Sequence, residues 1–376
     1  MTSAPFESVR AEEPSEVPEA ILTVAAATEA HLHEIFQSEI DRWNQNDPRI
    51  GEAVVTLANM VLGRGKRLRA AFCYWSWDGT RRWIGNNSRN EDDVMSACAA
   101  FELLQAFALI HDDIMDNAAT RRGVPTIHTT EAARVQQLGW RGEPRRYGEG
   151  VAILLGDLAH AYADRCIGNT TGPARQLWDE LRIELNLGQY LDVRSSAAGD
   201  SDRETARAVT TFKSALYTIV RPLQMGAALA PGWEALSNDA KSQALGRLEA
   251  FGRPLGEAFQ LRDDLLGVIG QPIETGKPVG TDLREGKPTE LLAIALERAN
   301  PEERQLLAYV GHPDLNDEYI QAMVGVLHAT GAIHEVERRI NELVQQAHTA
   351  LPSLRIDPST QMTIATLADY VGLRTH

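Results

Sequence analysis

Two groups of aspartates are the residues of this chain best suited to chemistry: HDDIMD at 111–116 and LRDDLLG at 261–267. On a helix, Asp112 and Asp116 would lie one turn apart on one face, with Asp113 beside them. Carboxylates gathered on one face repel each other unless cations fill the space, and such oxygen ligands suit a hard ion such as Mg2+. Because Mg2+ usually binds through one or two carboxylates plus substrate phosphates, two facing acidic helices predict a diphosphate-binding cleft.

Basic residues flank both acidic motifs. An Asp–Asp pair by itself is most often part of a solvated helix face, so the interpretation depends on these neighbours. GRGKRLR at 63–69 precedes the first motif, TRRG at 120–123 follows it, and GKPVGTDLREGK at 276–287 follows the second. Lys and Arg suit phosphate oxygens, so cations around an acidic metal site are what two diphosphate substrates require.

The bulk composition excludes several classes of protein. The 376 residues carry a formal net charge of −15, which argues against nucleic acid as a main partner. Three widely spaced cysteines, at 73, 98 and 166, indicate a reduced cytoplasmic protein without a disulfide framework. We find neither a run of about eighteen apolar residues, as a transmembrane helix needs, nor the basic head and apolar stretch of a signal peptide.

Apolar residues recur at spacings of three and four from about residue 19 onward, which predicts an all-α protein: one large helical bundle over 19–376. Residues 1–18 are acidic and proline-bearing, and we expect a disordered tail there. No alternating strand pattern is found. Polar Gly- and Pro-containing stretches interrupt the helices at 79–92, 140–150, 196–203 and 270–288. Pro352 and Pro358 punctuate the end of the helical part.

Two long apolar helices are expected to carry the acidic motifs. The segment 92–118 is apolar nearly all round before its aspartates, so it must lie at the centre of the bundle. The segment 244–269 is similar, and Pro254 would kink or restart it.

Five motifs in a fixed order carry a resemblance to a known family. They are GKRLR at 65–69, LLQAFALIHDDIMD at 103–116, TRRG at 120–123, FKS at 212–214 and FQLRDD with its tail at 259–287. In these the chain resembles the trans-type polyprenyl diphosphate synthases, which include farnesyl and geranylgeranyl diphosphate synthases. The resemblance implies the isoprenoid-synthase bundle with a central cleft. It also implies Mg2+-dependent condensation of isopentenyl diphosphate with an allylic diphosphate, by ionisation, coupling and loss of a proton.

The resemblance also implies roles for individual residues. It assigns three Mg2+ ions with bound diphosphate to a set of aspartates: Asp112, Asp113, Asp116, Asp263 and Asp264. It assigns isopentenyl diphosphate to Lys66, Arg69, Gln105 and Arg122. It places around the allylic diphosphate Arg121, Lys213, Ser214, Gln260, Lys277 and Lys287. The residues expected to act in catalysis are Asp112, Asp116, Arg121, Lys213 and Asp263.

Three positions depart from the family pattern. Gly267 stands where many relatives have a further Asp, so metal binding there would rest on Asp263 and Asp264. Arg64 and Ala70 replace a usual Gly and Pro in the basic motif and leave Lys66 and Arg69 in place.

The resemblance also implies that product length depends on the residues four and five before the first aspartate, which are Ala108 and Phe107 here. Small Ala108 leaves room for a growing chain while Phe107 limits its depth, which favours geranylgeranyl diphosphate, with farnesyl diphosphate next. Long apolar helices, scattered tryptophans and the family habit favour a homodimer.

Three alternatives compete with this interpretation. A class I terpene cyclase shares the acidic motif but has no use for the isopentenyl site of Lys66, Arg69 and Arg122. A non-catalytic regulatory subunit should have lost its acidic or basic motifs, and Gly267 alone favours it. A purely structural helical protein leaves five ordered motifs unexplained.

Overall fold

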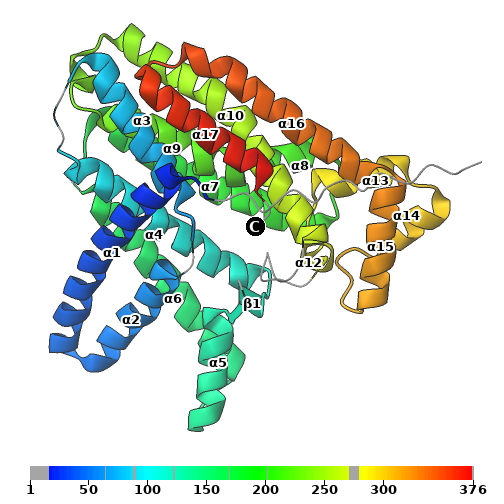
Figure 1. Cartoon of the computed structure of the whole chain (residues 1–376). Coiled ribbons are helices and arrows are strands. Elements are labelled where there is room, and N and C mark those ends of the chain that lie inside the picture. Colours follow the sequence, from blue (N-terminus) through cyan, green and yellow to red (C-terminus); the bar gives the residue numbers. More distant parts are fainter. Residues whose placement is uncertain are drawn as a thin grey trace, which may run out of the picture.

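The computed structural model describes residues 17–374, apart from 64, 87, 89, 122, 169, 201 and 271–278. The part of the chain so described is helical, as predicted (Figure 1). Its helices are α1 (Glu19–Asn46), α2 (Pro48–Leu62), α3 (Leu68–Ile84), α4 (Asp92–Met115), α5 (Ile127–Leu138), α6 (Pro144–Ile167), α7 (Gly172–Ala198), α8 (Arg203–Val209), η1 (Thr210–Val220), α9 (Arg221–Leu229), η2 (Trp233–Ala235), α10 (Asn238–Ile269), α12 (Thr281–Glu285), α13 (Glu290–Arg298), α14 (Pro301–Leu307), α15 (Asp317–Ala329), α16 (Ala332–Ala350), η3 (Leu351–Ser353) and α17 (Pro358–Leu373).

Helix α4 lies in the middle of the bundle, as its composition predicts. It packs against α6, α3, α1 and α9, and its residues 97–104 are buried without interruption. By length and composition α4 could cross a membrane, but 61% of its most apolar window is buried inside the structure. The helix is therefore accounted for as the core of the bundle, and it delivers the first acidic motif at its C-terminal end.

Helix α10 carries the second acidic motif and runs beside α16 and α17 (Figure 1). Pro254 lies inside this helix, which continues from Asn238 to Ile269 as one element. The expected restart at Pro254 is therefore absent. Pro358 likewise differs from the expectation, because it begins α17 instead of ending the helical part. Asp357 caps that helix by accepting hydrogen bonds from the amides of Ser359 and Thr360, and proline suits a first helical turn.

Two further differences lie close to the acidic motifs. The strands β1 (Thr120–Arg121) and β2 (Val124–Pro125) pair in an antiparallel arrangement and are too short to show an alternating pattern. The element η1 is a π-helix, a form often found at functional sites. Gly188 of α7 lets that helix approach η1 closely, because a Cβ there would lie 2.4 Å from the backbone nitrogen of Lys213.

Candidate active site

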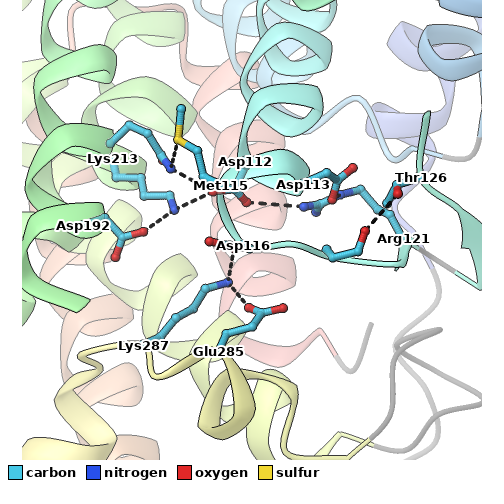
Figure 2. Close-up of polar contacts among 12 residues, drawn as sticks. Asp112, Asp113, Met115, Asp116, Arg121, Thr126, Asp192, Lys213, Glu285 and Lys287 are labelled. Atoms are coloured by element: carbon cyan, nitrogen blue, oxygen red, sulfur yellow. Dashed lines mark hydrogen bonds and ion pairs between the residues drawn. The ribbon is translucent and has the colours of Figure 1, made fainter. Parts of the chain in front are cut away.

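Asp112, at the C-terminal end of α4, is surrounded by hydrogen-bond donors from three other elements (Figure 2). Its Oδ1 accepts from Lys213 Nζ of η1 at 3.0 Å and from Gln189 Nε2 of α7 at 3.0 Å. Its Oδ2 accepts from Arg121 Nη2 of β1 at 3.3 Å. The carboxylate is therefore held by cations, and the repulsion between carboxylates expected from the sequence is offset by them.

Asp113 and Asp116, the latter the C-terminal cap residue of α4, contact different partners. Asp113 is buried and its Oδ1 accepts from Arg121 Nε at 2.7 Å. Asp116 Oδ2 lies 3.2 Å from Lys287 Nζ, from the segment after α12. In this arrangement Asp113 contacts Arg121, while Asp112 contacts Lys213 of η1 and Asp116 contacts Lys287 (Figure 2).

Lys287 connects the two acidic regions. Besides Asp116, its ammonium lies 2.5 Å from Glu285 and 3.8 Å from Asp282. Burial works against its charge, but Asp282, Asp116 and Glu285 outweigh this and raise the pKa of Lys287 well above the usual value. Lys287 is thus a permanent cation between the first motif and the acidic residues of α12.

The two aspartates of the first motif differ in electrostatics. Burial tends to raise the pKa of Asp112, but the charges of Lys213, Lys287 and Arg121 outweigh it and lower the pKa. For Asp116 burial prevails, and the pKa is raised. Asp112 therefore keeps a full negative charge at neutral pH, as a ligand of a cation must.

The second motif holds its two aspartates in different ways. Asp263 Oδ1 lies 2.6 Å from Nη2 of Arg374, at the C-terminal end of α17. Asp264 is buried and accepts from Gln260 Nε2 at 2.7 Å, and its burial, followed by the charge of Asp282, raises its pKa well above the usual value. Of the pair, Asp263 is the more exposed and the better suited to reach a bound ion.

Gly267 has a structural explanation in the position of Asp282. A Cβ built at Gly267 would lie 2.0 Å from Asp282 Oδ2 and 2.4 Å from its Cγ. The carboxylate of Asp282 therefore occupies the space of a side chain at position 267. The acidic group near this position is therefore Asp282 of α12, where many relatives have an aspartate on the helix that corresponds to α10.

Gly267→Asp is consequently expected to destabilise the protein instead of restoring a family feature. Overpacking typically costs about 1–3 kcal/mol, and the new carboxylate would also repel Asp282. Urea unfolding measures the loss. Gly246→Asp is the control, because Gly246 lies on the same helix with nothing within 4 Å of its added Cβ. Equal unfolding free energies for the two variants would refute this explanation of Gly267.

Two of the residues assigned to isopentenyl diphosphate, Lys66 and Arg69, lie around the start of α3. Arg69 Nη2 donates to Thr218 Oγ1 at 3.0 Å, its guanidinium lies 4.1 Å from the Tyr217 ring centroid, and its buried Nε has no partner among the described residues. Lys66 Nζ lies 5.3 Å from the ring centroid of Tyr370. Gln105 is half-buried on α4.

Three other assigned residues complete this account. Ser214 follows Lys213 on η1 and is buried. Arg122 and Lys277 lie outside the described residues, so their assignments stay predictions.

Several residues at the site were not identified from the sequence. Gln189 donates to Asp112, and Asp192 accepts from Lys213 Nζ at 2.6 Å. The two are three residues apart on one face of α7, directly after Gly188. Two polar side chains on one helix face beside Gly188, which allows η1 to approach α7, are the feature of the sequence that could have indicated them. The contact of Arg374 with Asp263 spans 111 residues and has no local signal.

The donor set fits a magnesium–diphosphate ligand in its chemistry. Among the described residues no three acidic, His or Cys side chains converge closely enough to hold an ion as they stand. Instead Asp112 and Asp116 form ion pairs with Lys213, Arg121 and Lys287. When the ligand binds, the carboxylates of these pairs would bind metal ions and the cations would bind phosphate oxygens.

Comparison with known proteins agrees with this geometry. The model of the polyprenyl synthetase family matches residues 52–327. A geranylfarnesyl diphosphate synthase of Aeropyrum pernix is 30% identical over 83% of this chain and 91% of its own length. A geranylgeranyl diphosphate synthase of Mycobacterium tuberculosis is 31% identical over 77% of this chain and 75% of its own.

A solved structure extends the likeness to the fold. The geranylgeranyl pyrophosphate synthase of Corynebacterium glutamicum, described as complexed with isoprenyl diphosphate and magnesium, is 33% identical with a TM-score of 0.85. The match covers 95% of this chain and 99% of that one. With cations from three parts of the chain around its first acidic motif in this fold, the chain belongs to the polyprenyl synthetase family of prenyl-transferring enzymes.

Proposed function

We propose that this enzyme condenses isopentenyl diphosphate with an allylic diphosphate in the presence of Mg2+ and forms mainly geranylgeranyl diphosphate. The observation that carries the proposal is the division of its cations. Lys213, Arg121 and Lys287 contact the first acidic motif, whereas Arg69 contacts Tyr217 and Thr218. Two separate groups of cations suit two diphosphates, and a cyclase would need one.

The side chains would divide the work as follows. Lys213, Arg121 and Lys287 would hold the oxygens of the allylic diphosphate and stabilise the charge that grows as it departs. Lys66 and Arg69 would hold isopentenyl diphosphate with its double bond toward the allylic carbon. The aspartates of both motifs would hold Mg2+, which supplies further positive charge to the leaving group. The apolar residues of α4 that precede the acidic motif would exclude water from the carbocation.

The pocket floor is proposed to lie at Ala108 and Phe107. Ala108 is one turn before Asp112 and so on the same face of α4. The Phe107 ring lies between two histidines, with centroid distances of 4.8 Å to His111 and 4.9 Å to His160 of α6. Burial lowers the pKa of His160, which favours its neutral form.

Product length should therefore respond in opposite directions to two substitutions. Ala108→Phe should shift the product toward farnesyl diphosphate by filling the space below Asp112. Phe107→Ala should lengthen it by opening space toward α6. The ratio of products by chain length is the measurement, because overpacking can lower the rate for unrelated reasons. The parent's product distribution in both variants would show that the chain grows along another wall.

A homodimer and a cytoplasmic location complete the proposal. Apolar side chains at Ile183, Leu187 and Tyr190 form a stripe on α7 and are each 54–67% exposed. Exposed stripes of this kind typically mark protein interfaces. The cysteines, free in the described chain, suit a reducing compartment.

Leu187→Asp should weaken the dimer, because a charge would enter the apolar stripe. Light scattering at micromolar concentrations should show dimer mass for the parent and reduced mass for the variant. Met362→Asp is the control, since Met362 is an exposed apolar residue on α17. A parent of monomer mass would contradict the proposed dimer.

One assay tests the function directly. Purified protein would be incubated with Mg2+, labelled isopentenyl diphosphate and, in turn, dimethylallyl, geranyl and farnesyl diphosphate. We expect label in products that end at twenty carbons. A twenty-five-carbon end point would correct the chain length alone, whereas release of diphosphate without incorporation of label would favour a cyclase.

A further inference from the structure

Lys66 lies in the loop between α2 and α3 and Arg69 in the first turn of α3, and Arg67 stands between them with an unusual backbone. Arg67 has a φ of 53°, and among the described residues the only other non-glycine with positive φ is Asn117. This left-handed conformation is unfavourable for a residue with a Cβ, so it persists where surrounding contacts hold it. Arg67 directly precedes α3 as its N-terminal cap residue.

The contacts that hold Arg67 come from three different helices. Its side chain is 5% exposed, and its Nη1 lies 2.8 Å from Oε2 of Glu102 on α4, which is 1% exposed. Its Nη2 donates to the carbonyl oxygens of Val61 at 2.6 Å and Gly63 at 3.2 Å, at the end of α2. Its Nε lies 3.3 Å from Glu29 of α1. One guanidinium thus caps the last turn of α2 and joins it to α1 and α4.

Through Glu102, the contacts of Arg67 reach the helix that carries the first acidic motif. Glu102 lies on α4 three residues before Gln105 and ten before Asp112. The buried pair therefore attaches the basic loop to the helix that carries the first acidic motif. On either side of Arg67, Lys66 reaches the ring of Tyr370 and Arg69 reaches that of Tyr217.

We propose that Arg67 is a positioning residue for the isopentenyl diphosphate site: its buried pair with Glu102 holds the left-handed turn from which Lys66 and Arg69 reach one diphosphate. The inference deepens the proposed function and rests on it. Arginine suits this role because its planar fork donates to several acceptors at once, which the single ammonium of lysine cannot reproduce in one geometry.

Steady-state kinetics of Arg67→Met, Arg67→Lys and Glu102→Gln test the proposal. Misplacing both binding cations should raise KM for isopentenyl diphosphate by roughly tenfold to a hundredfold in Arg67→Met. KM for the allylic diphosphate should change by less than about threefold, because Lys213 and Lys287 do not depend on this loop. Arg67→Lys should recover part of the loss. If Arg67→Met fails to fold, Arg67→Lys and Glu102→Gln still measure the same shift of KM.

The control is a buried ion pair at the other end of α3. Arg81 pairs with Asp78, and their side chains are 7% and 3% exposed, close to the 5% and 1% of the Arg67–Glu102 pair. Arg82 also contacts Asp78, so Arg81→Met/Arg82→Met removes both of these cations. This double variant should lower Tm as Arg67→Met does while KM for isopentenyl diphosphate stays within about twofold of the parent.

Two results would be decisive against parts of this account. If the Arg67 and Glu102 variants lose Tm but keep the parent's KM for isopentenyl diphosphate, Arg67 is only structural and the inference is overturned. If the parent itself does not consume isopentenyl diphosphate, the proposed function fails instead, which the same assay distinguishes.

Discussion

Asp112→Asn should reduce condensation by roughly 10² to 10³-fold, the size typical of losing one group that stabilises transition-state charge. Asp112 accepts hydrogen bonds from Lys213, Gln189 and Arg121. One substitution therefore disturbs both the proposed ion site and the cations proposed to hold the allylic diphosphate. The measurement is turnover across a titration of Mg2+. Near-parental turnover at limiting Mg2+ would refute the assignment of Asp112 as a ligand.

The same variant makes a separate prediction about stability. Carboxylates gathered on one helix face would repel each other, but the structure shows the cations Lys213 and Arg121 around Asp112. In metal-free buffer the variant should lose about 1–3 kcal/mol of unfolding free energy, because Lys213 and Arg121 lose a charged acceptor. Asp93→Asn is the matched control, since Asp93 is exposed in the first turn of the same helix.

Arg69→Ala should raise the KM for isopentenyl diphosphate by about one to two decades and leave that for the allylic diphosphate nearly unchanged. A charged hydrogen bond contributes roughly 1.5–3 kcal/mol, which corresponds to this range. The buried Nε of Arg69, unpartnered among the described residues, marks the donor that a phosphate oxygen would satisfy. Initial rates with one substrate varied at a time provide the measurement.

Arg82→Ala serves as the control for this experiment. Arg82 is on the same helix, its side chain is 44% exposed, and its contact is with Asp78 at the far end of α3. An equal rise of both KM values in Arg69→Ala would mean that the two diphosphates are not held by separate groups of cations.

The helical architecture and the first acidic motif could be predicted from the sequence because both depend on local spacing. Apolar residues at three and four positions determine the buried face of a helix, and α4 lies where its apolar composition requires. Asp112 and Asp116 share a face for the same geometric reason. The ends of elements were less predictable. Pro254 lies inside α10 without ending it, and Pro358 begins α17 because Asp357 caps that helix.

Contacts across the bundle were decided by the tertiary structure alone. Arg374 reaches Asp263 across 111 residues, and Asp282 fills the space beside Gly267 from another helix. No local periodicity encodes such pairs, since they depend on how α10, α12 and α17 pack. The sequence by itself determined which chemical groups are present and which helix faces carry them. Tertiary packing decided which carboxylate meets which cation, because electrostatic partners are chosen by distance in space and not along the chain.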